Sequence, residues 1–437
     1  MQLYETLYKW NLWGEWQPLF GHPRRIVSEI VHYLEEPEVV SIVGPRRAGK
    51  STVMYQIMQH LMNDGVDPKA ILHVNFEEPA LATALATGLL DDLYDTYRMR
   101  VFPKGKSFVF LDEIQNIDAW ERWVRARNEI EDIKIIVTGS SSPLLSREFG
   151  TLLTGRHLTI EVYPLDFRDQ LAFRNIEIPK EPYSMHANAS IKHAVLDYLK
   201  WGGMPRIVLS DDTRLRERLL SQYFDDILYR DVIMRHSIRD AQVLRNIAVY
   251  LLTQTASMIS YRRISDLFNV SQALVQSYCG YLQEAFLVNL LQCYSLKTAL
   301  RVRKPLKVHA IDLGLRQVVS FSQTSDECKL LESLVYRTLL DSKQDGIFYW
   351  HGDTEVDLVS RQGMEISRLI QVTFAGLDNE KTLRREIRAL EEAGKVYPNA
   401  KKLLVIFDVP NKLAFKIPKT IEVVPVWWLL LNPDYPT

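Results

Sequence analysis

The sequence is poor in cysteine, and the few cysteines it has form no recognisable pattern. Three occur among 437 residues, at Cys279, Cys293 and Cys328. An odd number at scattered positions excludes the paired framework of a small disulfide-rich secreted protein. The C-x-x-C spacing that would indicate a zinc site does not occur in the sequence. We therefore expect a protein of the reducing cytoplasm.

Long apolar runs and a strong net charge are absent as well. The longest apolar stretch near the C-terminus, Val423–Leu431, contains a proline and is far shorter than the about 20 residues that span a bilayer. The first residues, Met1–Glu5, lack the basic-then-apolar pattern of a signal peptide. The formal net charge is −1, so no global basic field attracts nucleic acid. We expect no membrane partner, and any nucleic-acid binding must depend on local patches.

What is present is the composition of an ordinary globular protein of several domains. Hydrophobic residues make up 47% and charged residues 24% of the chain. A chain of this length is too long for a single hydrophobic core. No internal repeat or low-complexity linker marks the boundaries.

A glycine-rich segment, residues 44–51, has the sequence GPRRAGKS. It follows an apolar run, Val39–Val43, and precedes an expected helix, Ser51–Leu61, which is the strand–loop–helix context of a phosphate-binding loop. In such a loop the backbone N–H groups face phosphate, Lys50 reaches the β- and γ-phosphates, and the Ser51 hydroxyl binds Mg²⁺. We therefore predict ATP and Mg²⁺ as cofactors. The predicted cofactor-binding residues are Gly44, Pro45, Arg46, Arg47, Ala48, Gly49, Lys50, Ser51 and Thr52.

A second apolar run, Phe108–Leu111, ends in two carboxylates, Asp112 and Glu113. Asp112 is placed to hold Mg²⁺ together with Ser51, and Glu113 to polarise the attacking water as a general base. Transfer of phosphate to a small substrate, as in a kinase, stays open. The adjacent Glu113 favours hydrolysis, because a simple kinase does not need a water-activating base.

Strands and helices alternate through the first part of the chain. Expected strands lie at Val39–Val43, Ile71–Phe76, Phe108–Leu111 and Ile133–Thr138, and expected helices include Arg25–Glu35 and Trp120–Glu131. Alternation of this kind indicates an α/β fold with a parallel sheet covered on both faces. Residues 167–235 are expected to be helical, with a break at Trp201–Pro205. Residues 240–295 predict helix, short strand, two helices and a strand, and another α/β unit follows residue 320.

Several strings together resemble a prokaryotic AAA+ ATPase family. They are Gly44–Ser51, Leu111–Gln115 followed by Trp120, Thr138–Ser141, Gly155-Arg156 and Pro164–Phe167. Trp201–Pro205 and Glu355–Leu358 fall where later motifs of that family would lie. The resemblance implies a P-loop AAA+ core at 1–166, a helical lid at 167–237, a winged helix at 238–320 and a restriction-endonuclease-like α/β domain at 321–437.

The same resemblance implies further catalytic residues beyond the loop and the acid pair. Thr138 or Ser140, at the end of a strand, would sense the γ-phosphate. Arg156 would be an arginine finger that stabilises charge on the transferring phosphoryl group, with Arg147 as a rival. A finger acting between subunits requires an assembly, so a homo-oligomer is expected. Arg46 and Arg47, inside the loop, are expected to face solvent or a partner.

The segment 240–295 has the helix and strand order of a winged helix. Ser271–Tyr278 would then be the recognition helix in the major groove of DNA. Basic residues at 301–307 would form a loop that neutralises phosphates. The alternative is a winged helix used for protein contacts, because the recognition helix contains no Arg or Lys. The predicted nucleic-acid-binding residues are Arg262, Arg263, Gln272, Gln276, Arg301, Arg303, Lys304 and Lys307.

The C-terminal α/β unit lacks part of the metal site of an endonuclease-like core. Glu332 and Asp357 match the helix acid and the strand acid that would share a divalent metal. Gln371 and Thr373 stand where the fold would need an acid and a lysine. We therefore expect this domain to be catalytically inactive and retained for binding or assembly.

These observations predict a cytoplasmic, Mg²⁺-dependent ATPase that remodels or senses DNA, branched DNA included. One alternative is a switch in which ATP binding and hydrolysis gate contacts with a protein partner. Another is a residual nuclease that uses Glu332 and Asp357.

Overall fold

The computed structural model divides the chain into two compact units, Met1–Tyr163 and Pro164–Thr437. Each unit is described by itself below. The structure describes residues 2–84, 87–140, 157–178, 188–295, 297, 301, 304–320, 327–342, 344–374, 380–407 and 417–436.

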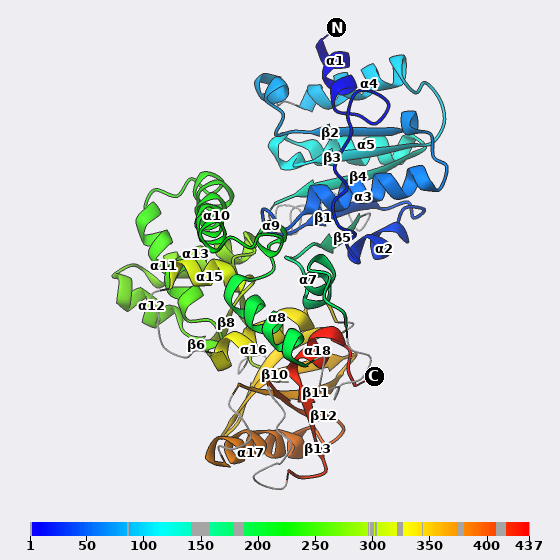
Figure 1. Ribbon diagram of the computed structural model, residues 1–437. Helices are drawn as coiled ribbons and strands as arrows, with labels where there is room; N and C mark the ends of the chain where they lie inside the picture. Colours follow the sequence, from blue (N-terminus) through cyan, green and yellow to red (C-terminus); the bar gives the residue numbers. More distant parts are fainter. Residues whose placement is uncertain are drawn as a thin grey trace. The chain divides into compact units, whose positions relative to one another are not determined.

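The first unit is built on a parallel sheet that has the order β2-β3-β4-β1-β5 among the described residues (Figure 1). Its strands are β1 (Val39–Val43), β2 (Ile71–Asn75), β3 (Ser107–Asp112), β4 (Ile133–Gly139) and β5 (His157–Glu161). The predicted α/β fold and the four predicted strands are confirmed to within a residue or two. The sequence did not predict β5. Because all the strands are parallel, their carboxyl ends lie at one edge.

Helices cover this sheet, and one of them, α3, directly follows the loop 44–51. The helices are α1 (Gln2–Lys9), α2 (Ile26–Val31), α3 (Lys50–Asn63), α4 (Thr87–Arg100) and α5 (Trp120–Ile130). On one face, Val53 and Ile57 of α3 pack with Ile30 of α2 against Ile42 and Phe110 of the sheet. α5 contacts β4 and α4. A helix that follows the loop directly and packs on the sheet holds the loop at the sheet edge.

The second unit begins with the helical region that the sequence predicted. It contains α7 (Phe167–Phe173), α8 (Asn188–Trp201), α9 (Pro205–Val208) and α10 (Thr213–Asp226), which continues as a π-helix over Ile227–Met234. At the break, Gly202 has a φ of +70°, and a Cβ there would lie 2.3 Å from Asp312 Oδ1. The Asp312 carboxylate accepts hydrogen bonds from Gly203 N at 2.8 Å and Leu315 N at 3.1 Å, which fixes the turn.

The middle of this unit combines helices with a small antiparallel sheet. Its order is α11 (Ala241–Thr253), β6 (Ser257–Ile259), α12 (Tyr261–Phe268), α13 (Gln272–Glu284), β7 (Val288–Leu291) and β8 (Leu306–Ala310). The described strands pair in the order β6-β8-β7. The predicted elements over 240–291 are present, with Ser271 capping α13 through Leu274 N. β8 was not predicted, and the winged-helix assignment stays a prediction.

The last part of the chain forms a mixed sheet with the order β13-β12-β11-β10-β9 among the described residues. β9 (Gly346–His351), β10 (Glu355–Gln362) and β11 (Glu365–Thr373) are antiparallel, and β12 (Lys401–Ile406) and β13 (Ile421–Pro425) continue in parallel from β11. α17 (Glu380–Val396) packs on one face, and α16 (Glu327–Leu339) and α18 (Val426–Leu431) contribute to the core on the other. α15 (Leu313–Val319) leads into this region. β13, α15 and α18 were not predicted.

An apolar core extends along much of the second unit, from Phe167 to Leu431. It joins residues of the helical region, the middle region and the mixed sheet, including Trp201, Leu251 and Leu358. The predicted boundaries at 167–237, 238–320 and 321–437 therefore stay predictions. Among the described residues, no helix is both long and apolar enough to cross a bilayer.

Candidate functional site

The loop between β1 and α3 takes the shape of a phosphate-binding loop because of two glycines. Gly44 has a φ of +152°, and a Cβ there would lie 2.1 Å from the carbonyl oxygen of Val162. Gly49 has a φ of +98° and forms the N-cap of α3. Arg47, which is exposed, also has a positive φ, of +69°. The backbone can therefore curl closely beside β5 and present N–H groups at a helix N-terminus.

The Lys50 side chain is folded back onto this loop. It is 4% exposed, and its ammonium donates hydrogen bonds to the carbonyl oxygens of Gly44 at 3.1 Å and Pro45 at 3.2 Å. The same nitrogen lies 3.9 Å from Glu113 Oε1. The strongest donor of the loop is thus held by neutral acceptors, next to one predicted catalytic acid.

Asp112 and Glu113 lie at the carboxyl end of β3 and are linked to the neighbouring strand β4 by one hydroxyl. Thr138 Oγ1 donates to Asp112 Oδ1 and accepts a hydrogen bond from Glu113 N at 3.0 Å. Ser51 also hydrogen-bonds the Asp112 carboxyl. Glu113 has a φ of +54°, and its Oε2 accepts a hydrogen bond from Gln115 at 2.5 Å. The backbone at the acid pair is therefore held in an uncommon conformation by specific contacts.

Burial perturbs the Asp112 carboxyl. Desolvation raises its pKa from 3.8 to about 6, and the nearby Glu113 charge adds to this. Hydrogen bonds from Thr138 and Ser51 and the charge of Lys50 act in the opposite direction. A buried carboxyl that is costly to ionise, in contact with a serine hydroxyl, has the donor chemistry that Mg²⁺ prefers. The residues present therefore fit a Mg²⁺ ion with its nucleotide.

The two candidate sensors take different positions at the end of β4. Thr138 makes the contacts to the acid pair described above. Ser140 is fully buried just beyond the strand. Arg156 and its rival Arg147 lie outside the described residues.

An arginine that no motif marked supports the loop from behind. The guanidinium of Arg24 donates to the carbonyl oxygens of Ala48 at 3.1 Å and Tyr163 at 3.2 Å, so it joins the loop to the end of β5. Its backbone N–H donates to Gln56 Oε1 at 3.0 Å. The Gln56 amide in turn donates to the carbonyl oxygens of Phe20 and His22, each at 2.7 Å. This ties the segment 20–24 to α3.

The two loop arginines differ from the prediction in part. Arg47 is exposed, as expected. Arg46 is partly buried and forms an ion pair with Glu77 at 2.9 Å. No sequence pattern indicates this pairing, because Glu77 follows a different strand, β2.

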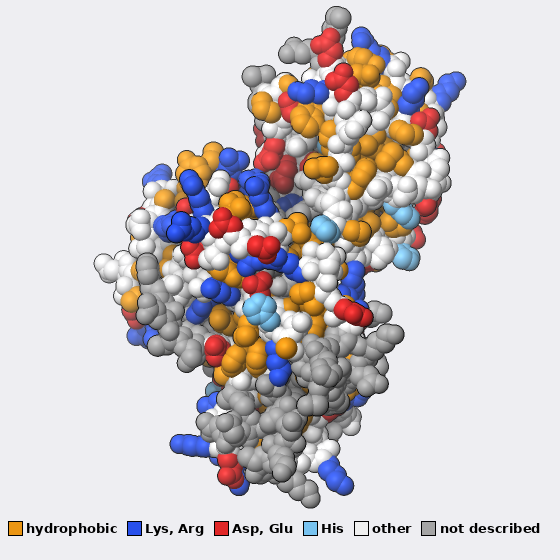
Figure 2. Space-filling view, in the orientation of Figure 1, with side chains coloured by type: hydrophobic (Ala, Val, Ile, Leu, Met, Phe, Trp, Pro, Cys, Tyr) orange, Lys and Arg blue, Asp and Glu red, His pale blue; other side chains and the backbone are white. Residues whose placement is uncertain are grey.

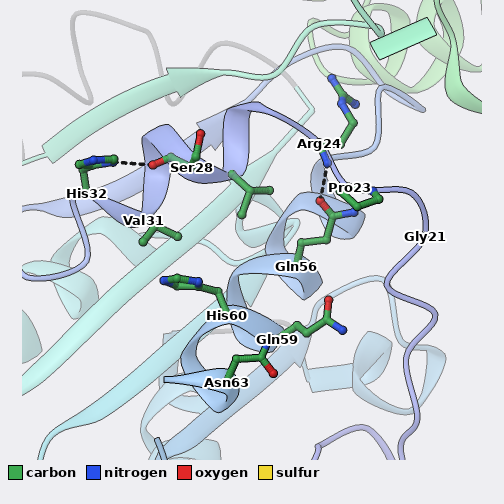
Figure 3. Close-up of a pocket in the computed structure, with 11 residues that line it drawn as sticks. Gly21, Pro23, Arg24, Ser28, Val31, His32, Gln56, Gln59, His60 and Asn63 are labelled. Carbon is green, nitrogen blue, oxygen red and sulfur yellow. Dashed lines mark hydrogen bonds between the residues drawn. The ribbon is translucent and has the colours of Figure 1, made fainter. Parts of the chain in front are cut away.

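A cavity of about 480 Å³ lies beside the segment 20–24, between α2 and α3 (Figure 3). Arg24 and Gln56 stand at one end, and the imidazoles of His32 and His60 stand at the other. None of the lining residues belongs to the loop 44–51 or to the acid pair. The cavity is therefore separate from the predicted phosphate and Mg²⁺ positions.

Most predicted nucleic-acid-binding residues lie on accessible surface. Arg262 and Arg263 are exposed on α12, and Gln272 and Gln276 are exposed on α13. Arg301 and Lys304 are partly exposed, and Arg303 lies outside the described residues. In Figure 2, Lys and Arg side chains over α9 and α10 are interspersed with Asp and Glu.

The assignment of Lys307 to an exposed basic loop is wrong. Lys307 lies within β8 and is 2% exposed. Its ammonium lies 2.5 Å from Glu332 Oε1, 2.6 Å from Glu355 Oε1 and 3.6 Å from Asp357 Oδ1. The structure thus brings together the two acids that the sequence singled out, Glu332 and Asp357, but around a lysine.

Comparison with known proteins agrees with the geometry of the first unit. Residues 36–171 match the family model of an AAA domain, and residues 192–326 match a domain of unknown function (DUF8612). The uncharacterized protein MJ1544 of Methanocaldococcus jannaschii is 34% identical over 427 residues, which cover 93% of this chain and 91% of that protein. An uncharacterized protein of Haemophilus influenzae is 26% identical over 357 residues, covering 80% and 85%.

Among solved structures, the Aeropyrum pernix ORC1 protein in complex with DNA is 14% identical, with a TM-score of 0.32. The match covers 69% of this chain and 93% of that one. AMPPCP-bound DnaA from Aquifex aeolicus is also 14% identical, with a TM-score of 0.27, and covers 59% and 86%. Scores this low carry no argument about function. The identity and coverage of the match to MJ1544 are high enough to show the family. The chain belongs to the same family as MJ1544, with an AAA domain at residues 36–171.

Proposed function

We propose that this protein is a Mg²⁺-dependent ATPase. The observation that carries the proposal is the meeting of Lys50, Ser51, Asp112, Glu113 and Thr138 at one edge of the first sheet. They come from three separate segments, the start of α3, the end of β3 and β4, and together they supply a phosphate-binding cation, two Mg²⁺-type oxygen donors and a base. A chance glycine-rich turn would not be expected to collect the three residues from outside it, Asp112, Glu113 and Thr138.

The residues divide the work of hydrolysis. The Lys50 ammonium exchanges its carbonyl contacts for phosphate oxygens, and the N–H groups of the loop bind the remaining ones. Ser51 and Asp112 would hold Mg²⁺, which would neutralise charge on the phosphates. Glu113 accepts a proton from the attacking water. Thr138 positions both acids through its hydrogen bonds to the Asp112 carboxylate and the Glu113 N–H. Ser140 and Arg156 are further phosphate-sensing candidates.

The test is ATP hydrolysis by the purified protein with and without Mg²⁺. Lys50→Ala should abolish nucleotide binding, whereas Glu113→Gln should keep binding and lower kcat by about a hundredfold or more. Lys69→Ala, an exposed lysine of the same unit, is the matched control and should leave the rate unchanged. Hydrolysis that persists in both site variants would refute the proposal.

We further propose that the ATPase acts on DNA. The support is the exposure of Arg262, Arg263, Gln272 and Gln276 on the adjoining helices α12 and α13. The Gln side chains are suited to base edges and the Arg side chains to phosphates. With Lys307 excluded, the basic contribution of the 301–307 segment is smaller than the sequence suggested.

Salt dependence distinguishes this interface from nonspecific attraction. Duplex, single-stranded and four-way-junction DNA are titrated at several salt concentrations. The double variant Arg262→Glu, Arg263→Glu should weaken binding and reduce the slope of log K against log salt by about 1.8 for duplex DNA. Lys395→Glu, an exposed charge change on α17, is the control. An unchanged slope in the double variant would exclude α12 as a phosphate contact.

A switch that acts on a protein partner is the second candidate. The observation that favours it is the exposure of large apolar side chains beside α10, where Tyr229 is 58% and Met234 62% exposed. Apolar side chains of this size favour protein contacts over nucleic acid. ATP turnover that is indifferent to every DNA form, together with nucleotide-dependent oligomer size, would favour this candidate.

A further inference from the structure

Four charged side chains meet inside the second unit, apart from the ATPase site. Lys307 comes from β8, Glu332 from α16, and Glu355 and Asp357 from β10. The Lys307 ammonium contacts the first two acids at 2.5 and 2.6 Å and lies 3.6 Å from the third. The lysine is 2% exposed, although its charged end would normally reach solvent.

We propose that Lys307 is the built-in cation of this carboxylate cluster and occupies the position that a divalent metal would take in an endonuclease-like core. The cluster is then an ionic joint between β8 and the mixed sheet, and not a metal centre. This inference is independent of the ATPase proposal.

The geometry leaves little room for a metal ion beside the lysine. Divalent cations bind carboxylate oxygens at about 2.0–2.6 Å, and the ammonium already contacts Glu332 and Glu355 at such distances. The other Asp357 oxygen, Oδ2, accepts a hydrogen bond from Val372 N at 2.9 Å. Within the part of the chain that the structure describes, no group of three or more His, Cys, Asp and Glu is arranged to hold a metal ion.

The residue at the expected third ligand position is also engaged elsewhere. Gln371 Oε1 accepts a hydrogen bond from Asp357 N at 3.3 Å, and its amide donates to Glu386 Oε2 at 2.5 Å. Glu386 in turn pairs with Arg385 at 2.5 Å. Gln371 is therefore engaged with Asp357 and Glu386, and it adds no carboxylate to the cluster.

The charges favour a permanently ionised lysine. Burial alone would lower the pKa of Lys307, but Glu332, Asp357 and Glu355 outweigh it and raise the pKa above its usual value. Burial raises the pKa of Asp357 to about 6, against the effect of Lys307. His309, 3.9 Å from Glu332, has a pKa well below 6.5 because of burial and the Lys307 charge, so it adds no cation near pH 7. Removing the ammonium would leave buried carboxylates uncompensated.

Metal rescue tests this assignment. Lys307→Met is prepared in the Asp112→Asn background, so that the ATPase site does not contribute to metal binding. Its melting temperature should be lower than that of the parent, and Mn²⁺ at about a hundredfold over its Kd should restore about 5 °C or more by binding in place of the ammonium. The parent should not respond to Mn²⁺. Lys304→Met, a partly exposed lysine of the same segment, is the matched control and should behave like the parent.

Two outcomes would overturn the proposal. One is saturable Mn²⁺ binding by the parent that is lost on adding Asp357→Asn, because lysine and metal would then coexist in a complete site. The other is a Lys307→Met protein that melts like its parent and ignores Mn²⁺, because the carboxylates would then need no cation.

A measurement on the unsubstituted protein covers the case in which Lys307→Met does not fold. Reductive methylation followed by peptide mass spectrometry should modify Lys304 and leave Lys307 unmodified until the protein unfolds. Equal labelling of the two lysines in the folded protein would show that Lys307 is accessible and would contradict its role as the buried cation.

Discussion

Asp112 should destabilise the protein as long as no Mg²⁺ is bound, so Asp112→Asn should raise thermal stability while abolishing ATP hydrolysis. The carboxyl is almost fully buried, and its pKa is raised from 3.8 to about 6. At neutral pH the folded protein must therefore keep an ionised group that burial disfavours. An asparagine has nearly the same shape and no charge, and its Oδ1 can still accept the hydrogen bond from Thr138.

The size and pH range of the effect follow from the pKa shift. A raised pKa means that the folded state holds the proton more tightly than the unfolded state, so stability falls as pH rises from about 4 to about 6 and stays reduced above that. A shift of about two pKa units corresponds to about 3 kcal/mol of unfolding free energy at pH 7. We expect about 1–3 kcal/mol in practice, because the new amide N–H groups need acceptors. For a unit of this size that is about 3–10 °C in melting temperature.

The assay is differential scanning calorimetry between pH 4.5 and 8 in the absence of nucleotide and divalent ions. Asp112→Asn should raise the melting temperature of the first unit above pH 6, and the gain should shrink as pH falls toward 4. Asp92→Asn, an exposed acid on α4, is the control and should change little at any pH. A lower melting temperature for Asp112→Asn at pH 7.5, or a gain that does not depend on pH, would refute the reasoning.

Two further substitutions test how the loop is held. Gly44→Ala should abolish nucleotide binding and lower the melting temperature, because its Cβ would lie 2.1 Å from the Val162 carbonyl oxygen in a conformation that favours glycine. Gly65→Ala, at a positive-φ glycine with open space around it, is the control. Nucleotide binding retained by Gly44→Ala would contradict the close approach of the loop to Val162. Arg24→Lys should weaken nucleotide binding at least several-fold in a titration with a fluorescent ATP analogue, because the guanidinium uses two separate nitrogens for the Ala48 and Tyr163 carbonyls, at 3.1 and 3.2 Å, and an ammonium lacks this planar fork. Unchanged affinity would show that this link does not position the loop.

The sequence predicted the first unit well because its signals are local. Val39–Val43 and Ile133–Thr138 are apolar runs bounded by polar residues, and buried parallel strands have this pattern. The loop 44–51 follows β1 and the acid pair ends β3, and both strands belong to one parallel sheet, so parallel order alone brings Lys50 and Asp112 to one edge. Both predictions needed no knowledge of distant contacts.

The contacts of Lys307 and Arg24 could not be predicted from local sequence patterns. Leu306–Ala310 alternates apolar and polar residues, which predicts one buried and one exposed face, and the preceding basic residues suggested a solvated loop. The polar face is in fact covered by acids that follow 25 and 50 positions later, Glu332 and Asp357. Arg24 is bound by carbonyl groups at positions 48 and 163, and no residue pattern near position 24 records that. Pairing between polar groups that lie far apart in the sequence produces no periodic residue pattern, so it cannot be predicted from the sequence alone.

Two of the buried lysines, Lys50 and Lys307, explain why one acid cluster suits chemistry and the other does not. Lys50 is held by two neutral carbonyls at 3.1 and 3.2 Å and stands 3.9 Å from its nearest acid, so exchanging those contacts for phosphate costs little. Lys307 contacts Glu332 and Glu355 at 2.5 and 2.6 Å, and displacing it would leave the buried Glu332 carboxylate without its cation. Asp112 thus keeps a site that a metal ion can complete, whereas Glu332 and Asp357 already have their cation.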